Sequence, residues 1–260
     1  MTKPVLQDGI LPGLPADLIR AQYAVAPGNE IESGKFLSPE SSAALAANAF
    51  GIFLNKPTAL PPLPIGDDEE WHPISVKLEA ENRFPWSGGR HPWLDVLVEL
   101  PTAVVGVESK RYEPFRNKGK PELSDAYWRP VWGDNMGRFC QVRDDLRSQS
   151  LLFERLDAAQ LVKHAFGLRT TVHRVSGPEI KVPVLLYLYA EPLSWPDGRP
   201  VPPEHISVHR QEVDQFAERV AGDEVRFVGL SYGELLHTWK QAEDATVREH
   251  AIVIETAFSP

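Results

Sequence analysis

Alternation of apolar and polar residues predicts β-strands in the first half of the chain. Residues 74–81 place Ile, Val, Leu and Ala on one side and Ser, Lys and Glu on the other, which is the period of a half-buried strand. Residues 93–100 and 103–110 follow, separated only by Pro101-Thr102, a spacing short enough for a hairpin. The run 182–190 is apolar throughout, so we expect a strand covered on both faces, and 224–230 predicts another strand.

Several helix signals stand between and after these strands. Ser38-Pro39-Glu40 offers a capping hydroxyl, a proline at the first helical position and an acid at the positive end of the dipole, so a helix is expected from there to about Leu54. Ser231 to Glu234 forms a capping box that opens a later helix. Further helices are expected near 138–148, 157–167 and 205–221, and the last segment, 246–257, fits a helix or a strand.

The order of these elements predicts the fold class. Strands that cluster first and helices that are interleaved later favour one α/β domain with a central mixed sheet flanked by helices. Residues 1–37 contain four prolines and scattered glycines, and we expect them to form an N-terminal arm or an irregular wrap around the domain. Residues 38–260 are expected to form the single domain.

Composition narrows the class of protein. A chain of 260 residues can bury a large core without disulfides. No apolar run of about 18 residues is present, so a membrane span is not expected, and the first 25 residues do not resemble a secretory signal. Cys140 is the single cysteine and cannot form an intramolecular disulfide, which fits a reducing compartment. We therefore expect a cytoplasmic protein.

Net charge and motif content exclude several function classes. The net charge of -9 argues against a protein that coats nucleic acid through a broad basic face, although a nucleic-acid enzyme with a carboxylate-rich metal site is compatible with it. His205 and His209 lack a third zinc ligand nearby in the sequence. Gly88-Gly89 is a turn and not a phosphate-binding loop, and no serine-hydrolase elbow occurs.

The predicted hairpin carries the most informative charged residues. Side chains alternate along a strand, so Asp95 on the second strand and Glu108 with Lys110 on the third can meet on one face. Two carboxylates and the backbone carbonyl of Ser109 offer the hard oxygen donors that Mg²⁺ or Mn²⁺ prefers. Such a metal polarises a phosphate oxygen and lowers the pKa of a bound water, while a nearby lysine can orient or deprotonate that water or stabilise developing negative charge.

This pattern resembles the PD-(D/E)XK nuclease superfamily, the fold of many restriction endonucleases. More narrowly, the strings Gly89-Arg90-His91-Pro92-Trp93-Leu94-Asp95 and Val105 to Phe115 are similar to those of a group of restriction-endonuclease-like bacterial proteins. Ser41-Ser42 with Asn48 and Phe50, and the segment 160–164, also resemble that group. The likeness covers about residues 40 to 170, and its extended part through Glu113-Pro114-Phe115 is far more specific than the Asp, Glu and Lys alone.

The resemblance implies a divalent-metal-dependent endodeoxyribonuclease. Asp95 and Glu108 are then metal ligands, Lys110 is the catalytic lysine, and Gln160 is a supporting polar residue on a helix beside the site. One further acid often completes such sites. Glu79, Glu81 and Glu40 are the alternatives here, and periodicity does not choose between the first two. The resemblance also implies DNA as the partner, reached by Lys163 or His164, and by analogy a homodimer.

A basic zone and two tryptophans follow the motif. The cations from Lys110 to Arg147 can receive a phosphate backbone or form an ordinary solvated face; they are Lys110, Arg111, Arg116, Lys118, Lys120, Arg129, Arg138, Arg143 and Arg147. Trp128 and Trp132 can stack on bases or anchor the core, and Glu113 can support the site or lie on the surface.

Two other function classes remain open from the sequence. The chain can be a binding module that kept the nuclease fold and lost turnover, because fold membership does not guarantee activity. It can also be an enzyme that hydrolyses another phosphate ester with the same carboxylates.

Overall fold

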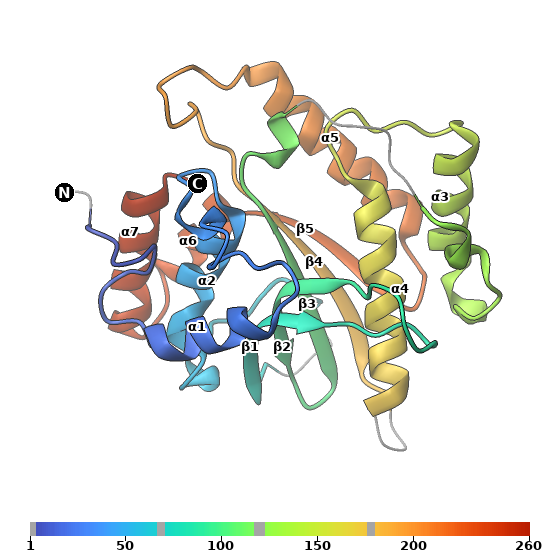
Figure 1. Ribbon diagram of the computed structural model, residues 1–260, viewed down its shortest axis with the longest axis horizontal. Helices are drawn as coiled ribbons and strands as arrows, with labels where there is room; N and C mark the ends of the chain where they lie inside the picture. Colours follow the sequence, from blue (N-terminus) through green and yellow to red (C-terminus); the bar gives the residue numbers. More distant parts are fainter. Residues whose placement is uncertain (1–3, 67–70, 117–122, 176–179) are drawn as a thin grey trace.

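The computed structural model of the protein describes residues 4–66, 71–116, 123–175 and 180–260, and these form an α/β fold around one five-stranded mixed sheet (Figure 1). The sheet order is β1-β2-β3-β4-β5, where β1, β2 and β3 are antiparallel neighbours and β3, β4 and β5 run parallel. The strands are β1 (Ser75–Glu81), β2 (Trp93–Glu99), β3 (Ala103–Lys110), β4 (Val182–Tyr189) and β5 (Arg226–Ser231). All five strands were predicted, and the β2–β3 hairpin is confirmed.

Helices cover both faces of the sheet (Figure 1). One layer holds α1 (Ala16–Val25), α2 (Ser42–Phe50), α6 (Tyr232–Trp239) and α7 (Ala245–Phe258). The other layer holds α3 (Gly137–Ser148), α4 (Ala158–Val175) and α5 (Pro203–Val220). No helix in the described parts of the chain has the length and apolar character to cross a membrane.

Strand β4 shows why the sequence folds into two layers. Val184, Leu186 and Leu188 belong to the core on the α2 side, whereas Leu185 and Tyr187 belong to the core on the α4 side. A strand that is apolar at every position can therefore fill both cores at once, as its sequence predicts. This burial fixes the register of the central strands and hence the position of whatever follows them at their carboxyl ends.

The N-terminal segment differs from the expected arm or irregular wrap. It contains α1, and Ile19 and Tyr23 of that helix are buried in the core on the α2 side. Helix α2 also begins later than predicted. Ser41 is its N-cap and accepts a hydrogen bond from the Ala44 amide at 3.0 Å, while Ser38 caps only a preceding turn through the Glu40 amide. Two serines three residues apart offer the same capping chemistry, and the sequence did not distinguish them.

The later helices are largely as predicted. The capping box at Ser231 and Glu234 opens α6. Helix α4 continues eight residues beyond the expected end at 167, to Val175. The ambiguous last segment is helical because Val247, Ala251 and Ile254 form one buried stripe at helical spacing.

Gly167 lets α4 approach the segment that joins β1 to β2. A Cβ built there would lie 2.8 Å from Pro92 and 3.1 Å from the Asn82 carbonyl oxygen. Gly167→Ala should therefore lower the free energy of unfolding by about 1–3 kcal/mol, although alanine is the better helix former. Urea denaturation followed by tryptophan fluorescence measures the change.

Gly137→Ala is the matched control for this substitution. Gly137 has helical dihedral angles, and a Cβ there would meet no atom within 4 Å. We expect its free energy of unfolding to change by no more than about 0.5 kcal/mol. Equal effects of the two substitutions would show that close approach at Gly167 does not limit the stability.

Candidate functional site

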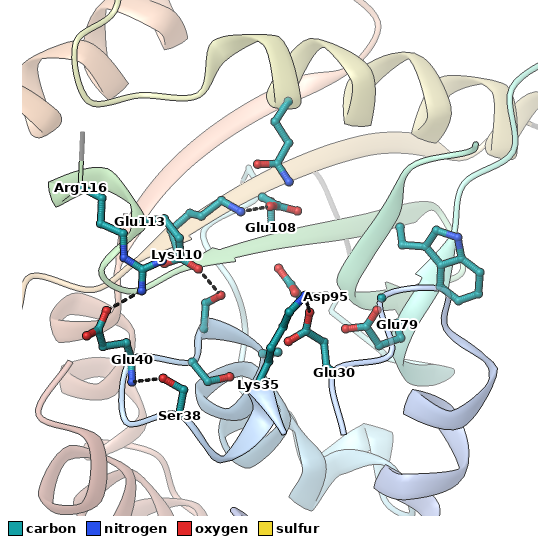
Figure 2. Close-up of a pocket in the computed structure, with 16 residues that line it drawn as sticks. Glu30, Lys35, Ser38, Glu40, Glu79, Asp95, Glu108, Lys110, Glu113 and Arg116 are labelled. Carbon is teal, nitrogen blue, oxygen red and sulfur yellow. Dashed lines mark hydrogen bonds and ion pairs between the residues drawn. The ribbon is translucent and has the colours of Figure 1, made fainter. Parts of the chain in front are cut away.

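A polar pocket of about 620 Å³ lies at the edge of the sheet where β1 and β3 end and β2 begins (Figure 2). Among its described lining residues, six carboxylates face three cations. The lining comprises Gly28, Glu30, Lys35, Ser38, Glu40, Ser41, Ser42, Ala43, Glu79, Trp93, Asp95, Glu108, Lys110, Glu113, Arg116 and Gln160. This excess of negative charge is confined to one small volume, which favours a cationic ligand.

Strand register aligns the central acids of the pocket. Leu78 pairs with Val96 and Ala80 with Leu94, so Glu79 lies opposite Asp95. The β2–β3 register ends where Val96 pairs with Val107, and Asp95 and Glu108 are the next residues beyond that pair. Three adjacent strands therefore each contribute one carboxylate at the same level of the sheet.

Glu108 is a buried carboxylate held by two basic side chains. Its residue is only 2% exposed, Lys110 Nζ donates a hydrogen bond to Oε1 at 2.5 Å, and His164 Nε2 lies 2.9 Å from Oε2. Burial alone would raise the pKa of Glu108, but the charge of Lys110 and the contact with His164 lower it to about 2. Glu108 is therefore ionised at neutral pH.

The pKa values of Asp95 and Lys110 are both raised, but for different reasons. Burial and the neighbouring Glu108 raise the pKa of Asp95 well above its usual value, although Lys110 and a hydrogen bond from the Ser109 amide to Oδ2, at 2.6 Å, oppose this. Burial would lower the pKa of Lys110, but Glu108, Glu113 and Asp95 raise it above its usual value. Lys110 is therefore a charged donor in this arrangement and not a free base.

Glu79 is the further acid that the structure brings into the pocket. Burial, Glu30 and Glu108 raise its pKa to about 7. Its backbone has φ of +49°, a conformation that costs about 1–2 kcal/mol for a residue with a side chain. Strain of this kind is concentrated at functional sites. Glu81 is not among the described residues that line the pocket, and it forms an ion pair with Arg83 at 3.0 Å.

The remaining predicted residues fall in and around the same pocket. Gln160 lines it from α4, whereas Glu40 pairs with Arg116 at 2.5 Å. The Ser109 side chain turns away and its Oγ lies 2.7 Å from the Tyr232 hydroxyl, so only its backbone is oriented toward the β2 side. Glu113 supports the site, because its Oε1 accepts a 2.5 Å hydrogen bond from Ser42.

Sequence reasoning missed two neighbours of these carboxylates. Glu30 lies in the N-terminal segment that was expected to be an arm, and it points into the pocket beside Asp95 and Glu79 (Figure 2). His164 was one of two alternatives, with Lys163, for a residue that faces DNA, but it is 2% exposed and lies against Glu108. Helical spacing offered a signal for His164, since it follows Gln160 by four residues and shares its side of α4.

Parts of the predicted basic zone serve the core instead of a surface. Arg111 is buried and donates hydrogen bonds to the Pro39 and Phe258 carbonyl oxygens, and Arg143 is also buried. Trp132 is 3% exposed and stacks on Phe166 with ring centroids 4.2 Å apart, which excludes it from stacking on bases. Lys118 and Lys120 lie outside the described residues.

Comparisons with known proteins add no relatives. Neither protein-family models, curated proteins nor solved structures gave a match to this chain. Across the described ranges, no three His, Cys, Asp or Glu side chains are grouped closely enough to hold a metal ion. The pocket itself is therefore the feature from which a function can be inferred.

Crowding of carboxylates should destabilise the metal-free protein. We expect Glu79→Gln, in the presence of EDTA at pH 8, to increase the free energy of unfolding by about 1–2 kcal/mol, because it removes a buried negative charge and its repulsion from Glu30 and Glu108. Calorimetric melting measures this gain. Glu81→Gln is the control on the same strand, and we expect its effect to stay within about 0.5 kcal/mol. A Glu79→Gln protein no more stable than the wild type would contradict the crowding.

Proposed function

We propose that the protein is a divalent-metal-dependent endodeoxyribonuclease with a restriction-endonuclease-like core. The observation that carries this proposal is the alignment of Asp95 with Glu108 across the β2–β3 hairpin, with Lys110 in the same pocket. These are the three residues on which the resemblance to the PD-(D/E)XK superfamily rests. Gln160 lines the pocket as well, from the helix on which the resemblance implies it.

The donor chemistry of the pocket fits Mg²⁺ or Mn²⁺. Asp95 and Glu108 line the pocket with hard oxygen donors, and Glu79 is the acid best placed to join them. The backbone carbonyl of Ser109, which follows Glu108 but is not among the described lining residues, would be the further donor. Burial and neighbouring carboxylates raise the pKa of both Glu79 and Asp95, so a cation bound among them would stabilise their ionised forms. When bound, the metal would polarise a phosphate oxygen and lower the pKa of a coordinated water.

The chain's own residues would divide the remaining work. Lys110 is held as a cation, so its role is to orient a water and stabilise the negative charge that develops on the phosphate. His164 on α4 contacts Glu108 and positions its carboxylate, and Gln160 offers an amide at the pocket wall. Arg116, half exposed beside Glu40, can meet the DNA backbone.

One observation favours a catalytically inactive nuclease-fold module as the second candidate. Within the described part of the chain no three metal-binding side chains are grouped, and Glu108 already has Lys110 and His164 as partners. Such a module would bind DNA or protein without hydrolysing phosphodiester bonds.

Metal binding and plasmid nicking, measured on the same samples, distinguish the two candidates. Calorimetric titration with Mn²⁺ should show binding to the wild-type protein and none to Glu108→Ala, which should also lose nicking. Lys110→Ala should still bind Mn²⁺ and lose about 10²–10³ in nicking rate, the usual cost of one lost charge-stabilising donor. Lys77→Ala, an exposed lysine on β1, is the control and should nick like the wild type.

Each outcome of this experiment points to one candidate. Metal binding without nicking by the wild-type protein on supercoiled, linear and single-stranded DNA would favour the inactive module. Full nicking by Lys110→Ala would remove the catalytic role of that lysine. A wild-type protein that binds no metal, with or without DNA, would show that the carboxylates are structural.

A further inference from the structure

A second pocket lies between α4 and the end of α3. Its volume is about 660 Å³, within the range of small-ligand sites. Its described lining residues are Arg90, Leu123, Ser124, Tyr127, Trp128, Leu146, Arg147, Gln149, Leu152 and Lys163. We refer to it as the cationic pocket, and to the pocket around Asp95 and Glu108 as the acidic pocket.

The two pockets differ in the charged side chains that line them. Among the described residues that line the cationic pocket, the charged side chains are all cations, namely Arg90, Arg147 and Lys163. The whole chain carries a net charge of -9, so the positive charge of this pocket is opposite in sign to that of the protein. Arg147 also pairs with Asp125 at 3.2 Å, but both side chains are more than half exposed, and such pairs exchange partners at little cost. An anionic ligand therefore fits this pocket.

Aromatic rings form one wall of the same pocket and are fixed in place. Trp128 donates a hydrogen bond to Asp144 at 2.7 Å, and the Arg147 guanidinium lies 4.1 Å from the centre of its ring. Lys163 Nζ lies 5.9 Å from the Tyr127 ring. Leu152 also lines the pocket and is 71% exposed, so apolar surface is available to a ligand. Rings of this kind stack on bases, and adjacent cations bind the attached phosphate.

The two pockets share the segments that build them. Helix α4 contributes Gln160 to the acidic pocket and Lys163 to the cationic pocket. The segment that leads into β2 contributes Trp93 to the first and Arg90 to the second. Three residues along a helix cover about 4.5 Å of its axis, so α4 contributes neighbouring side chains to the two pockets.

We propose that the cationic pocket binds one unpaired nucleotide, with its base against the partly exposed Trp128 and its phosphate between Arg90 and Lys163. Binding of a nucleotide here does not require that the acidic pocket be active. The assignment of that nucleotide to a DNA strand being cut rests on the proposed nuclease function. It implies a preference for single-stranded or locally unpaired DNA, because a paired base is stacked inside the duplex and cannot enter.

Binding in EDTA tests the proposal without cleavage. Fluorescence anisotropy of a labelled oligothymidine should show binding to the wild-type protein, weakened about tenfold by Lys163→Glu and by Arg90→Glu. Lys77→Glu, with the same charge change outside both pockets, should stay within about twofold of the wild type. Arg90 is exposed, so its variant keeps the test valid where Lys163→Glu does not fold, as judged by circular dichroism.

The remaining arms identify the source of the nucleotide and the outcomes that would overturn the proposal. Competition by thymidine 5′-monophosphate that is lost in Lys163→Glu would support the pocket and show that a free nucleotide also enters it. Blunt duplex bound as tightly as single strand, or equal weakening by Lys77→Glu, would overturn it. Because no cleavage occurs in EDTA, failure here is distinct from failure of nicking with Mg²⁺, which concerns only the nuclease proposal.

Discussion

A buried carboxylate at the end of the central sheet is the constraint on which the site depends. Strand β3 is apolar from Ala103 to Val107 and lies between two neighbours, so Glu108 enters a region with little water. An unpaired charge there would cost several kcal/mol. Lys110 and His164 supply the compensation, one from the same strand and one from α4. The position of α4 over the sheet is thereby tied to the ionisation of one residue.

Hydrogen bonds fasten the N-terminal layer to the same strand end. Arg111 follows Lys110 and holds two carbonyl oxygens, of Pro39 before α2 and of Phe258 at the end of α7. Glu113 accepts a hydrogen bond from Ser42 in the first turn of α2. Hydrogen bonds between residues far apart in the sequence thus hold this layer against the end of β3, beside the acidic pocket. The loop that carries Glu30 belongs to the same layer. Arginine suits this role because its planar fork can satisfy two carbonyls at once.

The sequence predicted the sheet well because its signals are local. Period-two alternation located β1, and uniform apolar character located β4, since each pattern follows directly from which faces are buried. The site was predictable as far as one hairpin extends, which covers Asp95, Glu108 and Lys110. Glu30 and His164 come from other layers. No spacing in the sequence connects Glu30 to β3, and His164 is connected only indirectly, through its helical spacing from Gln160. The choice of Glu79 over Glu81 depends on the positive φ at Glu79, which alternation does not encode.

Helix α4 contributes side chains to both pockets. Gln160 and His164 lie toward the acidic pocket and Lys163 toward the cationic one, while Gly167 sets how closely the helix approaches the β1–β2 connection. Because these side chains project from one helix, any shift of α4 displaces the walls of both pockets together. Gly167 therefore limits the positions of residues in both pockets at once, although it is not among the described lining residues of either.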